Sequence, residues 1–209
     1  MQKMVIIGIC GKMGNRLYEF YKDSFNVVGI DCTKHAQALT YDTIDGIEGI
    51  DVVVDFSSTD CYDQLKAAIL SHIPVLCGTT GYELEQINAL KQLAAEQETV
   101  FIWKANYAKG IKLFSKLIED SKASFPILDF VEIHATTKKD APSGTAKVLA
   151  KELNIDESKI QSLRINQAPA IHEIIFSSEN ERVILRHEII NQRAFIMGFD
   201  EELKKVVRS

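Results

Sequence analysis

Residues 4–14 read Met4-Val5-Ile6-Ile7-Gly8-Ile9-Cys10-Gly11-Lys12-Met13-Gly14 and join an apolar run to a glycine-rich turn and an amphipathic segment. This order predicts a buried strand, a tight turn and a helix. Gly8 permits the turn, Gly11 lets a ligand approach the backbone, and Gly14 lets the helix pack against the strand. Free N–H groups at the start of such a helix attract phosphate. The stretch therefore predicts a dinucleotide-binding domain.

An acidic residue ends the second predicted strand. Asp31 follows Gly8 by 23 residues, where a carboxylate can accept hydrogen bonds from the adenosine ribose hydroxyls. A carboxylate also repels a 2′-phosphate, and Lys34 and His35 offset this repulsion only in part. We therefore predict NADH as the preferred cofactor, or dual use of NADH and NADPH. The plainer interpretation is a strand–turn–helix corner with Asp31 in a solvated loop.

The first hundred residues alternate apolar runs with helical patterns, as parallel sheets covered by helices do. After the first strand, further strands are predicted at Asn26–Asp31, Asp51–Phe56, Pro74–Cys77 and Val100–Lys104. Helices are predicted at 12–23, 60–71 and 82–96. The connection from Cys32 to Ile50 is short and polar and carries only a weak pattern for one more helix.

After about Tyr107 the pattern changes. Helices are predicted at 111–121, 144–153 and 193–207, a strand at 128–134, and a hairpin from strands 172–177 and 182–190. The fold class is α/β: a Rossmann-type doubly wound parallel sheet, then an α+β domain with a mainly antiparallel sheet. We predict domains at 1–106 and 107–192, with a C-terminal helix, 193–209, packing back on the first.

Composition narrows the function classes. The net charge is −5 and no Lys/Arg run exceeds two residues, which argues against a nucleic-acid partner. No apolar stretch approaches the roughly 20 residues of a membrane span, so we expect no membrane partner. Cys10, Cys32, Cys61 and Cys77 lack metal-site spacing, so we expect reduced thiols, no metal and a cytoplasmic protein.

Residues 132–146, Glu-Ile-His-Ala-Thr-Thr-Lys-Lys-Asp-Ala-Pro-Ser-Gly-Thr-Ala, carry the richest chemistry in the second half. His134 can move a proton near neutral pH, and Lys138 adds a positive charge. A helix start capped by Ser143 or Thr145 presents N–H groups to an anion. The segment indicates a carboxylate-bearing ligand. Taken alone, the segment fits a purely structural role better than a binding site: a capped helix beside surface lysines and a partly buried histidine.

The segment resembles the signature of the 4-hydroxy-tetrahydrodipicolinate reductase family, also called dihydrodipicolinate reductase. The run D-A-P-S-G-T-A at 140–146 follows E-x-H-x-x-x-K. Shorter matches occur in the family's order: G-x-x-G-K-M-G at 8–14, D-F-S at 55–57, G-T-T-G at 78–81, A-N-Y at 105–107, S-L-R at 162–164, H-E at 172–173 and R-A-F at 193–195. The resemblance covers nearly the whole chain.

The resemblance implies a homotetramer that reduces 4-hydroxy-tetrahydrodipicolinate, a small dicarboxylate, to tetrahydrodipicolinate with NAD(P)H in lysine and diaminopimelate biosynthesis. It implies that 107–192 binds substrate and makes the assembly, that His134 and Lys138 are catalytic, and that Lys138 donates the proton. The implied substrate contacts are Ala135, Ser143, Gly144 and Thr145. The implied cofactor contacts are Gly8, Ile9, Cys10, Gly11, Lys12, Met13, Asp31, Gly78, Thr79, Thr80, Lys104, Ala105, Asn106 and Tyr107.

The chain departs from the family pattern at several positions. Ala135 stands where a second histidine is usual, Ile165 and Asn166 replace two glycines, and the region from Cys32 to Ile50 is short. Two other functions on the same fold stay open. One is a dehydrogenase of another amino-acid-derived dicarboxylate, and the other is a non-catalytic NAD(P)-sensing protein.

Overall fold

The structure is a computed structural model that describes residues 1–207, without the side chains of residues 127 and 128. The chain forms two compact units. The first unit holds Met1–Ala105 and the chain from Asp200 onward, and the second holds Asn106–Phe199. Helix α6 (Arg193–Val206) begins in the second unit and continues into the first. The last two residues of the predicted helix 193–209 lie outside the described residues.

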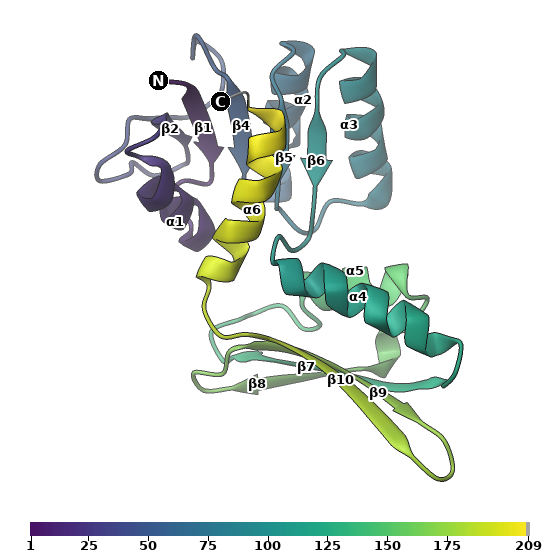
Figure 1. Cartoon of the computed structure of the whole chain (residues 1–209). Coiled ribbons are helices and arrows are strands. Elements are labelled where there is room, and N and C mark those ends of the chain that lie inside the picture. The colour runs from purple at the N-terminus through teal and green to yellow at the C-terminus, as the bar shows by residue number, and fades with distance from the viewer. Residues whose placement is uncertain (208–209) are drawn as a thin grey trace. The chain divides into compact units, whose positions relative to one another are not determined.

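The first unit contains a six-stranded parallel sheet in the order β3-β2-β1-β4-β5-β6 (Figure 1). This is the doubly wound order of dinucleotide-binding domains, so the predicted Rossmann-type sheet is confirmed. The strands are β1 (Lys3–Ile7), β2 (Asn26–Ile30), β3 (Thr40–Tyr41), β4 (Val52–Asp55), β5 (Val75–Cys77) and β6 (Phe101–Trp103).

Helices cover this sheet because apolar residues recur at helical spacing. Helix α1 (Lys12–Tyr21) buries Gly14, Leu17, Tyr18 and Tyr21, which lie on one face because they are spaced three or four residues apart or are direct neighbours. Helices α2 (Tyr62–Leu70) and α3 (Leu84–Glu96) share one core cluster with Val5 and Ile7 of β1. A 3-10 turn, η1 (Thr59–Cys61), precedes α2.

The weakly predicted helix between Cys32 and Ile50 is not formed. The segment instead contributes β3, which pairs with β2 through Gly29↔Thr40 and Ile30↔Tyr41. The loop before it is held by local contacts: the Thr40 hydroxyl accepts the His35 amide at 3.1 Å and donates to the Ala38 carbonyl. The segment lacks the apolar spacing that would bury one face of a helix.

The second unit is built on a four-stranded sheet in the order β10-β9-β7-β8. Its strands are β7 (Ile127–Ala135), β8 (Ile160–Ile165), β9 (Ala170–Ser177) and β10 (Arg182–Ile189). Only β7 and β8 are parallel, so the predicted mainly antiparallel sheet is confirmed. Helices α4 (Lys109–Lys122) and α5 (Gly144–Glu152) pack on one face (Figure 1). A 3-10 turn, η2 (Glu157–Lys159), leads into β8.

Strand β8 was not predicted, and its residues explain why. Its exposed positions are Gln161, Leu163 and Ile165, whereas Ser162 and Arg164 point to the helix-covered face. An amphipathic strand normally shows the reverse, with apolar residues inward. The polar residues point inward because they line the site described below.

Among the described residues, no helix is both long and apolar enough to cross a membrane. All four cysteines are free thiols.

Candidate active site

The glycine-rich turn between β1 and α1 is shaped for close backbone approach. Gly8 has φ +81° and donates its amide to the Ile30 carbonyl at 2.8 Å. A Cβ on Gly14 would lie 2.1 Å from the Gly8 carbonyl oxygen, so only glycine fits. Gly11 is the N-cap of α1, and no described side chain caps this helix. The N–H groups of its first turn are therefore open to an anion such as a phosphate.

Asp31 lies directly beside this turn. Its Oδ2 accepts the Cys10 amide at 3.0 Å, and its Oδ1 accepts the amide and hydroxyl of Thr33, both at 3.2 Å. Partial burial would raise the pKa of Asp31, but the backbone hydrogen bonds from Cys10 and Thr33 lower it below its usual value. The group is thus a carboxylate at neutral pH. His35 does not face it, because both ring nitrogens contact Asn15, Gln37 and Ala38.

The turns after β4 and β5 are joined by a buried polar network. Asp55 is fully buried and accepts hydrogen bonds from the Ser57 amide and the Cys77 thiol, both at 3.1 Å. The Ser57 amide also reaches the Thr79 hydroxyl at 2.9 Å. Burial raises the pKa of Asp55 above its usual value, although these hydrogen bonds oppose the shift. The network fixes the turn that carries Gly78, Thr79 and Thr80, of which only Thr80 is exposed.

The predicted cofactor residues after β6 belong to different units and contact different partners. Lys104 forms an ion pair with Glu202 at 2.9 Å in the first unit. Asn106 belongs to the second unit, where its amide nitrogen donates to the Thr145 hydroxyl at 3.3 Å. The Tyr107 ring is 5% exposed and packs on Phe199. The structure therefore joins Asn106 to the predicted substrate loop and buries the Tyr107 ring.

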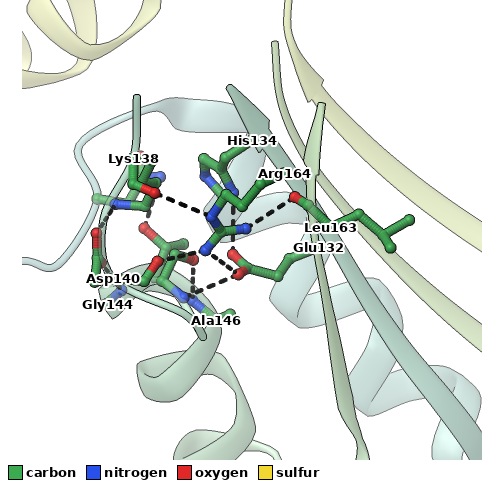
Figure 2. Close-up of polar contacts among 11 residues, drawn as sticks. Glu132, His134, Lys138, Asp140, Gly144, Ala146, Leu163 and Arg164 are labelled. Atoms are coloured by element: carbon green, nitrogen blue, oxygen red, sulfur yellow. Dashed lines mark hydrogen bonds and ion pairs between the residues drawn. The ribbon is translucent and has the colours of Figure 1, made fainter. Parts of the chain in front are cut away.

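In the second unit, Glu132 is the centre of a polar cluster on the helix-covered face of the sheet (Figure 2). Its side chain is fully buried, and Oε1 accepts Nη2 of Arg164 at 2.8 Å and the Ser143 amide at 3.1 Å. Its Oε2 lies 3.0 Å from Nδ1 of His134. Burial by itself would raise the pKa of Glu132, but the contacts with His134, Ser143 and Arg164 hold it well below its usual range. Glu132 is therefore an anion whose Oε2 lies against the His134 ring without a hydrogen bond between them.

Arg164 also holds the loop that follows β7. It donates to the backbone carbonyls of Lys138, Asp140 and Leu163, in addition to Glu132 (Figure 2). One guanidinium thus ties the strand that carries His134 to the loop that carries Lys138. The planar fork of arginine suits this task, because its five donors have fixed directions.

Lys138 and the start of α5 converge on one carboxylate. Asp140 Oδ1 lies 2.9 Å from the Lys138 ammonium, and Oδ2 accepts the Gly144 amide at 3.3 Å. Burial would raise the pKa of Asp140, but Lys138 and the Gly144 amide lower it. Lys138 is about one-third exposed and Asp140 about half. The pair of donors is thus spaced to hold a single carboxyl group within reach of solvent.

Ser143 differs from its expected role as an anion donor. Its amide is used by Glu132, its hydroxyl caps α5 by accepting the Ala146 amide at 3.2 Å, and the residue is 1% exposed. The Ser143 amide is therefore already used within the chain, and its substrate contact stays a prediction. The cap itself was predicted correctly. Gly144 and Thr145 remain half-buried beside the loop.

Two more imidazoles lie behind His134. His172 is 1% exposed, with its ring centre 5.5 Å from that of His134 and 6.2 Å from that of His187. Burial lowers the pKa of His172 to about 3, with the neighbouring His134 as the second cause. Burial also lowers the pKa of His187. Both rings are consequently neutral at physiological pH.

Ala135 lies on the other side of the sheet. It pairs with Ile165 as the last residue of β7, and side chains alternate along a strand, so it faces away from His134. The position of the usual second histidine is therefore not beside the Glu132 cluster in this chain.

The sequence analysis did not assign Glu132 and Arg164 to the site. The spacing of Glu132 and His134, two residues apart on a predicted strand, was a usable signal for a pair on one face. No local sequence pattern pointed to Arg164. It reaches Glu132 only because β7 pairs with β8, where Glu132 lies opposite Ser162, two residues before Arg164.

Comparisons with known proteins cover both units. A family model described as "Dihydrodipicolinate reductase, N-terminus" matches residues 2–107, and one described as "Dihydrodipicolinate reductase, C-terminus" matches residues 110–208. The 4-hydroxy-tetrahydrodipicolinate reductase of Rickettsia canadensis is 32% identical over 214 residues, which cover 91% of this chain and 87% of the relative.

Two solved structures show the same fold. The dipicolinate-bound dihydrodipicolinate reductase of Paenisporosarcina sp. TG-14 has a TM-score of 0.78 at 22% identity and covers 99% of this chain and 94% of its own. An aspartate dehydrogenase of Thermotoga maritima has a TM-score of 0.64 at 12% identity and covers 100% and 97%. The fold is thus shared with an enzyme of a different name.

Proposed function

The chain belongs to the dihydrodipicolinate reductase family, and we propose that it reduces 4-hydroxy-tetrahydrodipicolinate to tetrahydrodipicolinate with NAD(P)H in lysine and diaminopimelate biosynthesis. The observation that carries the proposal is the convergence of the Lys138 ammonium and the Gly144 amide on one carboxylate. In the structure that carboxylate belongs to Asp140. A carboxylate of the substrate can replace it, because the Lys138 and Asp140 side chains are both partly exposed.

The first unit fits the cofactor. The open N-terminus of α1 suits the pyrophosphate, and the ionised Asp31 beside Cys10 suits the ribose hydroxyls. When bound, the nicotinamide supplies a hydride. The remaining chemistry falls to the chain itself: once the 4-hydroxyl group has left the ring as water, Lys138 holds a carboxylate and gives a proton to the ring as it accepts the hydride, and His134 provides the neighbouring polar ring.

Glu132 and Arg164 act as positioning residues in this scheme. Glu132 orients His134 through the 3.0 Å contact, and Arg164 fixes the loop that carries Lys138. Placement of reacting groups within a fraction of an ångström strongly affects rate, so a rigid support around them is functional.

The direct test supplies the protein with the aldol product of pyruvate and aspartate semialdehyde and follows NADH absorbance. We expect oxidation of NADH that depends on both the protein and the aldol product. Activity only toward another amino-acid-derived dicarboxylate, such as aspartate, would favour a different dehydrogenase. Cofactor binding without turnover of either substrate would favour a nucleotide sensor.

The cofactor preference gives a separate prediction. We expect kcat/KM with NADH to equal or exceed that with NADPH, because the Asp31 carboxylate repels a 2′-phosphate. Asp31→Ala is expected to raise KM for NADH roughly 10–100-fold, since hydrogen bonds to a charged group contribute about 1.5–3 kcal/mol, and to improve NADPH relative to NADH. Asp42→Ala, which removes an exposed acid from the same region, serves as the control. A tenfold NADPH preference in the wild type would contradict the prediction.

We also propose a homotetramer assembled through the second unit and located in the cytoplasm. The face of the sheet opposite α4 and α5 exposes Leu163, Ile165 and Ile184 by 46%, 49% and 52%. Leu163 and Ile165 lie on β8 and Ile184 lies on β10, at the two edges of this sheet face, and exposed apolar side chains on one face are typical of a surface that another chain covers. The free thiols fit a reducing compartment. Light scattering on the purified protein measures the number of chains.

A further inference from the structure

Three side chains able to bind a metal meet on the helix-covered face of the second unit's sheet. Glu132 and His134 are two residues apart on β7 and so point to the same side. His172 of β9 lies directly across from Glu132 in the antiparallel register. The ligand atoms of the three residues lie within 4.8 Å of one another, and all three residues are buried.

His172 has no other task among the described residues. Neither of its ring nitrogens has a hydrogen-bond partner in the part of the chain that the structure describes, although the residue is 99% buried. Its neighbours are rings, with Phe130 at 6.3 Å and the two other imidazoles at 5.5 and 6.2 Å. Buried polar atoms without partners are rare in native proteins and call for an explanation such as a bound water or ion.

We propose that Glu132, His134 and His172 bind one divalent transition-metal ion of the zinc type. Ligands at about 2.0–2.2 Å from a tetrahedral zinc ion lie about 3.3–3.5 Å from one another. Oε2 of Glu132 and Nδ1 of His134 are already 3.0 Å apart. His172 completes the set by a rotation of its ring, which breaks no hydrogen bond within the described part of the chain.

The donors determine which ions bind. Two imidazoles and one carboxylate suit zinc, cobalt and nickel, whereas magnesium and calcium prefer sites made of oxygen atoms alone. Arg164 shares the Glu132 carboxylate through Oε1, so its charge opposes the ion. We therefore expect weaker binding than in a closed four-ligand zinc site, with the fourth position taken by water.

Bound zinc would inhibit the reductase, because the ion occupies the His134 ring and the carboxylate that orients it. This consequence rests on the proposed function, whereas the ion site itself does not. Free zinc would then regulate the enzyme at its own active site.

The experiment titrates metal-free protein with zinc and with cobalt and measures bound metal per chain by mass spectrometry of the isolated protein. We expect one ion at this site, no competition by magnesium, and a parallel loss of reductase rate that a chelator reverses. His172→Gln should weaken binding at least about 10-fold, since even groups that only support a metal ligand contribute 10–100-fold. His187→Gln is the matched control: an adjacent imidazole outside the ligand set.

Cobalt also reports the ligand type. The absorption spectrum of bound cobalt distinguishes nitrogen and oxygen ligands from thiolates. A spectrum without thiolate charge-transfer bands would exclude the exposed Cys10 and Cys32 as the ligands. Equal zinc affinity in the wild type and His172→Gln, thiolate bands, or no binding overturns the site. Binding without inhibition overturns the regulatory role. Protein that binds zinc here but reduces no dicarboxylate when metal-free supports the ion site and contradicts the proposed function.

Discussion

Lys138→Ala is expected to lower kcat for the dicarboxylate by about 10²–10⁴-fold, the usual contribution of a group that transfers a proton in the transition state. The loss should also appear in kcat/KM, because the same ammonium holds a substrate carboxylate. Stopped or continuous NADH assays measure both kcat and kcat/KM.

A control variant and a stability measurement separate a loss of the proton donor from a loss of charge or of folding. Lys139→Ala removes an adjacent exposed ammonium and should retain activity within a few-fold. The stability of Lys138→Ala should be nearly that of the wild type, because a partly exposed ion pair such as Lys138–Asp140 contributes only about 0–1 kcal/mol. A Lys138→Ala enzyme that turns over within about threefold of the wild type would remove the assigned proton donor.

Glu132→Gln is expected to lower the free energy of unfolding by about 3–5 kcal/mol, because it removes one partner of a buried ion pair and leaves Arg164 without a countercharge. Urea denaturation at neutral pH measures the change. The matched control is Glu173→Gln on β9, whose partner Arg186 is 45% exposed at 3.2 Å. That change should lower the free energy of unfolding by less than about 1 kcal/mol.

The same variant predicts an altered response to acid. The pKa of Glu132 is depressed in the folded protein, so its stabilisation is present above the unfolded value, 4.5, and is lost as the pH falls below it. The wild type should therefore lose stability on acidification more steeply than Glu132→Gln. Equal slopes, or a destabilisation no larger than that of Glu173→Gln, would show that the carboxylate does not hold this cluster together.

Much of the fold follows from local pattern. The apolar run before Gly8, the spacing of Gly8, Gly11 and Gly14, and the acid at Asp31 predicted the parallel sheet and its cofactor turn. These features are local because a strand, a turn and a helix start depend on neighbouring residues. The alternation in residues 172–177 and 182–190 predicted the β9–β10 hairpin for the same reason.

The candidate site was predicted only in part. Lys138, Gly144 and the helix start were identified from one continuous segment, and the structure brings Lys138 and the Gly144 amide onto a single carboxylate. Ser143 was assigned to the ligand, yet its amide turns inward to Glu132. A sequence shows which groups can donate, but not which acceptor of the folded chain already uses them.

By itself, then, the sequence determined the two kinds of sheet, the turn at Gly8–Gly14 and the chemistry available at His134 and Lys138. Only the tertiary structure decided that Arg164 joins Glu132 and that β8 turns its polar residues inward. It also decided that His172 lies behind His134 with no hydrogen-bond partner among the described residues. The physical reason is that local propensity acts between near neighbours. The burial and pairing of charges depend instead on strands that lie 30 or more residues apart in the chain, as Glu132 and Arg164 do, 32 residues apart.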